Sequence, residues 1–151
     1  MTALLTPELL SHIGNASSPR EELVTRRDIR KYSISTDQRL KKYLEGDEAP
    51  PMFHIALFWD VVEMDQLKPD GIPVDALVPK FPLERAMAGG SVIDYHRKIY
   101  PGDELVATRI LSNMFEKSGR QGPLIFCEVT MKIETAAGEP VITQKITRIM
   151  R

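Results

Sequence analysis

Acidic and basic side chains crowd the segment from Tyr32 to Phe53, which reads YSISTDQRLKKYLEGDEAPPMF. A carboxylate such as Asp37 and an imidazole such as His54, the first histidine after this segment, are groups that proteins use as general acids and bases. The segment therefore has two interpretations: an active-site loop, or a charged connection at the surface. The flanking elements decide whether Asp37 and His54 can meet.

Two helices are expected on either side of this segment. Thr25 suits the N-cap of the first, because Asp28 stands three residues on, as in a capping box. Pro50 and Pro51 end any regular structure before the second. The run that follows, MFHIALFWDVV, is apolar almost all round and predicts a long helix buried on most sides. A further short helix is expected over residues 6–14, with Thr6 as its cap.

From Ser91 onward the apolar residues recur every second position, which predicts strands. We expect strands over 91–99, 104–119, 124–136 and 141–150, with a turn at Pro101–Asp103. Residues 64–90 carry four prolines and predict a long irregular connection, of a kind that is usually functional or at an interface. A helix followed by an antiparallel meander favours an α+β fold in which the sheet wraps around a long central helix.

The bulk composition excludes several classes of protein. The 151 residues fit one domain spanning 1–151, and a net charge of −1 gives no field toward nucleic acid or an anionic membrane. The one cysteine, Cys127, fits a reducing compartment, and no apolar run reaches membrane-spanning length, so a cytoplasmic protein is expected. No metal-binding spacing and no glycine-rich phosphate loop is present, so neither a metal nor a cofactor is expected.

Other residues have both a functional and a structural interpretation. His54 could reach a ligand, although a lone histidine among apolar residues is more often a core group. His96 could contact a partner subunit or a ligand, or simply face outward from its strand, with Tyr95 on the opposite face. Gly89 and Gly90 could admit a ligand close to the backbone or serve a turn. The remaining candidates for substrate contact are Tyr95 and Phe53.

Four stretches, in order, resemble the hot-dog fold of MaoC-like acyl-CoA hydratases and dehydratases, in particular their N-terminal dehydratase domain. They are VTRRDIRKYSIST, EAPPMFHIALFWD, DYHRKIYPGDEL and MFEKSGRQGPLIFCEVTMKIETAAGEPV. The resemblance implies an acyl thioester of coenzyme A or acyl carrier protein as ligand, and its hydration or dehydration as the reaction. Catalytic members of this family carry an Asp and a His in a D-x-N-P-x-H pattern.

This chain departs from that pattern. Asp37 lies near the position of the family's aspartate, but Gln38 and Arg39 follow it directly, and Tyr43 stands about where the histidine would fall. The resemblance therefore implies a non-catalytic half that forms the acyl tunnel and pairs with a catalytic MaoC-like subunit, or forms homodimers. Two alternatives stay open: an acyl-CoA-binding or scaffolding protein without chemistry, and a self-sufficient hydratase that uses Asp37, His54 or His96.

Overall fold

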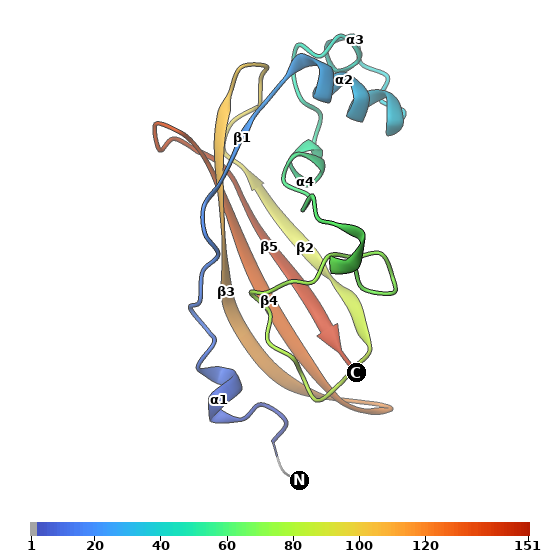
Figure 1. The fold of residues 1–151 in the computed structure, drawn as a ribbon, viewed down its shortest axis with the longest axis vertical. Helices are drawn as coiled ribbons and strands as arrows, with labels where there is room; N and C mark the ends of the chain where they lie inside the picture. The colour runs from blue at the N-terminus through green and yellow to red at the C-terminus, as the bar shows by residue number, and fades with distance from the viewer. Residues whose placement is uncertain (1–2) are drawn as a thin grey trace.

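The computed structural model describes residues 3–151, in which one antiparallel sheet forms the body of the molecule (Figure 1). Its strand order is β1-β3-β4-β5-β2, so β1 and β2 lie at the two edges. The strands are β1 (Arg20–Leu23), β2 (Ala86–Tyr95), β3 (Glu104–Gly119), β4 (Gly122–Thr135) and β5 (Pro140–Met150). The three long strands expected from the period of two over 104–150 are present, whereas β1 is an element that the sequence patterns did not reveal.

The face of the sheet that packs on the core follows the predicted alternation along β4. Every second residue there is buried: Ile125, Cys127, Val129, Met131 and Ile133. Strand β3 keeps the same alternation only as far as Leu111. The pairing of β3 with β4 shifts between Leu111 and Asn113, and this bulge brings Met114 onto the buried face. A strict period of two predicts Met114 on the face opposite Leu111, and the bulge makes that expectation wrong.

The helices are short and lie on one side of the sheet (Figure 1). They are α1 (Pro7–Leu10), α2 (Arg26–Ser35), α3 (Lys41–Leu44), α4 (Phe53–Leu57) and the 3-10 turn η1 (Met64–Gln66). The predicted caps are confirmed, since Thr6 accepts a hydrogen bond from the N–H of Leu9 and Thr25 accepts one from the N–H of Asp28. No helix within residues 3–151 is both long enough and apolar enough to span a membrane.

The long central helix expected from MFHIALFWDVV is a single turn and a half, α4, in front of the sheet. The chain leaves the helix at Phe58, because Arg20 of β1 donates hydrogen bonds to the carbonyl oxygens of Phe58 and Trp59. The same guanidinium pairs with Asp60, and Val61 is 98% exposed. An apolar composition alone therefore overestimated both the length and the burial of this helix.

The connection between α4 and β2 is irregular, as the prolines predicted, but it packs against the sheet. Phe81 is buried in a cluster with Leu111, Ile125 and Met150, and Leu77 lies partly buried beside them. Strand β2 begins at Ala86, five residues earlier than expected, and ends at Tyr95 rather than Ile99. The connection therefore covers one end of the core face, while α2 and α4 cover the other end (Figure 1).

Candidate acyl-binding site

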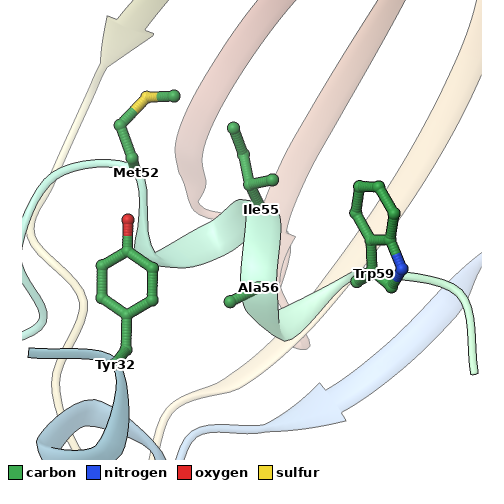
Figure 2. A pocket seen from close by; sticks show the side chains of 5 residues that line it. All are labelled: Tyr32, Met52, Ile55, Ala56 and Trp59. Atoms are coloured by element: carbon green, nitrogen blue, oxygen red, sulfur yellow. The ribbon is translucent and has the colours of Figure 1, made fainter. Parts of the chain in front are cut away.

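A pocket of about 480 Å³ opens where α2 meets α4 (Figure 2). Its lining consists of Tyr32, Met52, Ile55, Ala56 and Trp59, and we refer to it as the helix pocket. None of these side chains is charged, and Met52, Ile55 and Ala56 carry no hydrogen-bond donor, which suits an alkyl chain. Figure 2 shows the hydroxyl group of Tyr32 directed toward Met52.

Two tyrosines, Tyr32 and Tyr95, contact the start of α4 beside the helix pocket. The backbone N–H of Met52 donates a hydrogen bond of 3.2 Å to the hydroxyl of Tyr95, and Met52 itself has a left-handed backbone with φ of 70°. The ring of Tyr32 packs edge-on against Phe53 at 5.7 Å. Burial, with a smaller contribution from the nearby Tyr95, raises the pKa of Tyr32, so that its phenol stays protonated and can donate a hydrogen bond.

His54 lies beneath α4, fully buried, and does not line the helix pocket. Its Nε2 lies 2.7 Å from Oε1 of Gln144 on β5, and the amide of Gln144 donates in turn to Ser91 on β2. Burial lowers the pKa of His54, and the bond to Gln144 only partly offsets this. His54 is thus a neutral core histidine that ties α4 to the sheet.

Asp37 and His96 lie apart from the pocket lining. Asp37 ends α2 with a left-handed backbone, its side chain is 77% exposed, and it pairs with Arg39 at 2.7 Å. His96 follows the end of β2, is exposed, and lies 2.9 Å from the hydroxyl of Thr143. Tyr95 faces α4, as its contacts with Met52 and His54 show. The structure therefore does not bring Asp37, His54 and His96 together.

Gly89 and Gly90 stand within β2, at an irregularity in its pairing with β5. A Cβ on Gly89 would come within 2.9 Å of Ile149 and of Thr147 on β5, so this position needs glycine for close strand packing. Phe53 is buried in the core formed by the helices and the sheet. None of the three lines the helix pocket, and their predicted contact with substrate remains a prediction.

A second, smaller pocket of about 160 Å³ lies between the segment after α4 and the helix-facing side of the sheet. We call it the arginine pocket, because its charged lining comprises three arginines and two aspartates: Arg20, Arg109, Arg148, Asp60 and Asp75. Ile55 and Trp59 line this pocket as well as the helix pocket, so the two adjoin there. The sequence patterns did not reveal it, since its members are scattered from residue 20 to residue 148.

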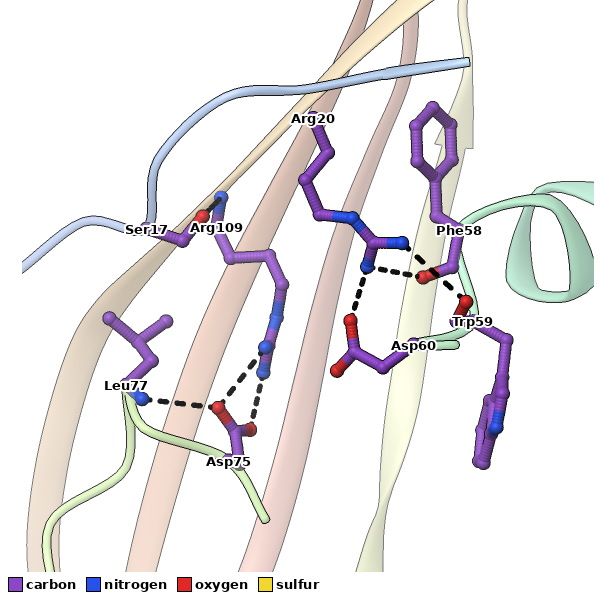
Figure 3. Close-up of polar contacts among 8 residues, drawn as sticks. All are labelled: Ser17, Arg20, Phe58, Trp59, Asp60, Asp75, Leu77 and Arg109. Carbon is purple, nitrogen blue, oxygen red and sulfur yellow. Dashed lines mark hydrogen bonds and ion pairs between the residues drawn. The ribbon is translucent and has the colours of Figure 1, made fainter. Parts of the chain in front are cut away.

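Asp75 pairs with two arginines of the arginine pocket, Arg109 and Arg148. Figure 3 shows the pair with Arg109. Its carboxylate accepts hydrogen bonds from both terminal nitrogens of Arg109, at 3.1 and 2.6 Å, and one from the N–H of Leu77. Burial would raise the pKa of Asp75, but the hydrogen bonds and charge of Arg109 and the charge of Arg148 outweigh it and hold the pKa low. Asp75 is therefore a carboxylate at neutral pH.

Hydrogen bonds within the turn after β2 give its charged residues a structural role rather than a catalytic one. Arg97 donates two hydrogen bonds to the carboxylate of Asp103, at 2.8 and 3.0 Å, and Asp103 also accepts from the N–H of Tyr100. In the matching stretch DYHRKIYPGDEL, Arg97 and Asp103 thus close a loop. Within residues 3–151, no three His, Cys, Asp or Glu side chains gather as a metal site.

Comparison with known proteins places these features in a family. Residues 11–144 match the model described as FAS1-like, dehydratase domain region. Over 85 residues the chain is 33% identical to mesaconyl-C(4)-CoA hydratase of Chloroflexus aurantiacus, an overlap of 56% of this chain. The matched part is 30% of that relative's length.

Solved structures share the architecture. The ChsH1-ChsH2 complex from Mycobacterium tuberculosis matches with a TM-score of 0.67 and 16% identity, over 95% of this chain and 91% of the other. R-hydratase PhaJ1 from Pseudomonas aeruginosa matches with a TM-score of 0.58 and 15% identity, over 91% of this chain and 80% of the other. These likenesses confirm the α+β hot-dog fold that the sequence predicted.

Proposed function

Because this chain belongs to the family of FAS1-like dehydratase domain regions, with the MaoC-like hot-dog fold, we propose that it is the acyl-binding, non-catalytic half of a hydratase/dehydratase. Its ligand would be an enoyl or 3-hydroxyacyl thioester of coenzyme A or acyl carrier protein. A MaoC-like partner subunit would supply the catalytic Asp and His.

One observation carries the non-catalytic assignment: each of the three histidines of the chain bonds a neutral side chain. His12 lies 3.3 Å from the amide of Asn15, His54 bonds Gln144, and His96 bonds Thr143. General acid–base hydration needs a group that is accessible to substrate and poised near neutral pH. Asp37 instead pairs with Arg39 in solvent.

The position of the missing histidine supports the same proposal. Tyr43 lies in α3 with the ammonium of Lys42 5.0 Å from its ring centroid. A phenol lacks the basic ring nitrogen of an imidazole, so Tyr43 does not replace the histidine as a general base. Neither the N-P pair nor the histidine of the D-x-N-P-x-H pattern follows Asp37.

The helix pocket supports the binding half of the proposal. An alkyl chain laid against Ile55, Ala56 and Trp59 leaves water for apolar surroundings, a transfer worth about 0.8 kcal/mol for each buried methylene. The hydroxyl of Tyr32, which lines this space and is protonated at neutral pH, is a hydrogen-bond donor suited to a thioester carbonyl.

An edge of the sheet is available for a partner. Strand β2 pairs with β5 on one side only, and its side chains include exposed Met87, Val92 and Tyr95. Long edge strands with apolar side chains commonly pair with another chain. A second hot-dog domain, either another copy or a catalytic subunit, would cover this edge.

The test uses Trp59, the sole tryptophan of the chain and a wall of the helix pocket. Titration with a trans-2-enoyl-CoA should change its fluorescence saturably, while the purified chain alone should not hydrate the enoyl group. Hydration should appear on addition of the MaoC-like protein with an intact D-x-N-P-x-H loop from the same genome. Turnover by the chain alone would refute the proposal, and binding without turnover in any mixture would favour a non-enzymatic acyl-CoA-binding protein.

A further inference from the structure

The arginine pocket carries an unbalanced charge. Three arginines and two aspartates line it, a formal excess of one positive charge in a space walled on the other sides by apolar side chains such as Met131 and Ile146. Charges in such half-enclosed surroundings are poorly solvated and are normally paired. One bound carboxylate would balance the lining.

Of the three arginines, Arg148 has the weakest interactions with neighbouring side chains. Arg20 is held by Asp60 and by the carbonyl oxygens of Phe58 and Trp59, and Arg109 is held by Asp75 through two hydrogen bonds. Arg148 approaches Asp75 only at 3.4 Å, and its guanidinium makes no side-chain hydrogen bond within residues 3–151. Beyond this ion pair, its planar set of donors can therefore bind a carboxylate with two hydrogen bonds.

The arginine pocket adjoins the helix pocket, because Ile55 and Trp59 line both. An acyl chain that lies in the helix pocket and passes these two side chains reaches the arginines with its far end. The volume of about 160 Å³ equals about five water molecules in the liquid. This admits a carboxylate and a few methylenes, and it excludes the nucleotide of coenzyme A.

We propose that Arg148 binds the free carboxylate at the far end of the acyl chain, so that this domain selects thioesters of dicarboxylic acids. The inference rests on the proposed acyl-thioester function and specifies the class of its substrate. A thioester that ends in a methyl group would leave the guanidinium without a partner and would bind more weakly.

The test compares two five-carbon thioesters, glutaryl-CoA and pentanoyl-CoA, with free coenzyme A as a third probe, by Trp59 fluorescence. We expect the chain to bind glutaryl-CoA about tenfold more tightly than pentanoyl-CoA, the size of effect given by one charge-assisted pair of hydrogen bonds. Arg148→Met should remove this preference and leave pentanoyl-CoA binding within twofold. Arg148→Lys should keep part of it, because the charge remains but the planar fork is lost.

A matched control is available on the same strand. Lys145 pairs with Glu128 at 3.6 Å and does not line the arginine pocket, so Lys145→Met should keep the full preference. Equal or tighter binding of pentanoyl-CoA by the unmodified chain would overturn this inference while the acyl-binding function stands. If neither thioester binds, both this inference and the proposed acyl-binding function are wrong. If Arg148→Met weakens the binding of both thioesters and of free coenzyme A equally, the arginine binds a phosphate of coenzyme A. That result would also overturn this inference.

Discussion

Nε2 of His54 on α4 lies 2.7 Å from Oε1 of Gln144 on β5, and both side chains are buried. As the amide of Gln144 is oriented, its oxygen accepts and the proton lies on Nε2 of the imidazole. Nδ1 of His54 is buried and has no hydrogen-bond partner among the described residues. Protonation of His54 would therefore place a charged N–H in a site that offers it no acceptor.

This relationship predicts that stability falls as the pH is lowered from 7.5 to 5.5. The pKa of His54 in the folded chain lies below the ordinary 6.5, so the unfolded chain binds the proton first and acid favours unfolding. The loss begins near pH 6.5 and reaches at most about 1.4 kcal/mol by pH 5.5. Urea unfolding at several pH values measures it.

Two variants make the pH test specific. His54→Gln is less stable throughout but should show a flatter dependence between pH 7.5 and 5.5. His96→Gln removes an exposed histidine and should keep the dependence of the unmodified chain. An unchanged pH dependence in His54→Gln would show that another group is responsible.

Replacement of Asp37 by asparagine tests the candidate acid directly. Asparagine adopts the left-handed backbone that Asp37 has at φ of 54°, and the ion pair with Arg39 is exposed. We expect unchanged stability, and hydration by the chain mixed with the proposed catalytic partner within twofold of the unmodified mixture. A rate reduced by a hundredfold or more would instead identify Asp37 as a general acid or base.

The strands were predictable from the sequence because their signal is local. A period of two gave the limits of β3 correctly and identified every buried position along β4. The bulge after Leu111 was not predictable in this way, because it depends on how β3 pairs with a strand that follows it. The short length of α4 likewise depends on Arg20, which lies 38 residues before the carbonyl of Phe58 that it binds.

The site was less predictable than the fold, because its residues lie far apart in the sequence. Tyr32 and Trp59 lie 27 positions apart in the sequence, and only the packing of α2 on α4 makes them walls of one pocket. Asp75 belongs to an irregular connection, where no periodicity indicates which way a side chain points. The resemblance to MaoC-like dehydratases predicted the class of chemistry, whereas the structure places Asp37 in solvent and His54 in the core.

The cap of α2 should matter for the helix pocket, because this helix carries Tyr32. The hydroxyl of Thr25 accepts from the N–H of Asp28 at 3.1 Å and donates to its carboxylate at 2.6 Å. Thr25→Ala should reduce the free energy of unfolding by about 1 kcal/mol, whereas Thr25→Ser should keep most of it. Thermal unfolding followed by circular dichroism compares the two, and equal loss in both variants would contradict a capping role.

Asp75→Asn should loosen the connection between α4 and β2 from the sheet. The variant loses the carboxylate that Arg109 binds through two hydrogen bonds, and it leaves two guanidinium groups without their negative partner. The side chain of Asp75 is only 12% exposed, so water replaces these bonds poorly. We expect the free energy of unfolding to decrease by about 2 kcal/mol in urea unfolding followed by Trp59 fluorescence.

Proteolysis locates the same effect within the chain. Trypsin cleaves after lysine and arginine but not before proline, so within the connection it can cut after Lys80 and Arg85, whereas Lys68 precedes Pro69. If the ion pair holds the connection down, Asp75→Asn should be cut there faster than the unmodified chain under conditions in which the sheet stays folded. Asp65→Asn, at an exposed position of the same connection, should be cut at the original rate. Equal rates in all three proteins would mean that apolar packing of Phe81, rather than the ion pair, keeps the connection on the sheet.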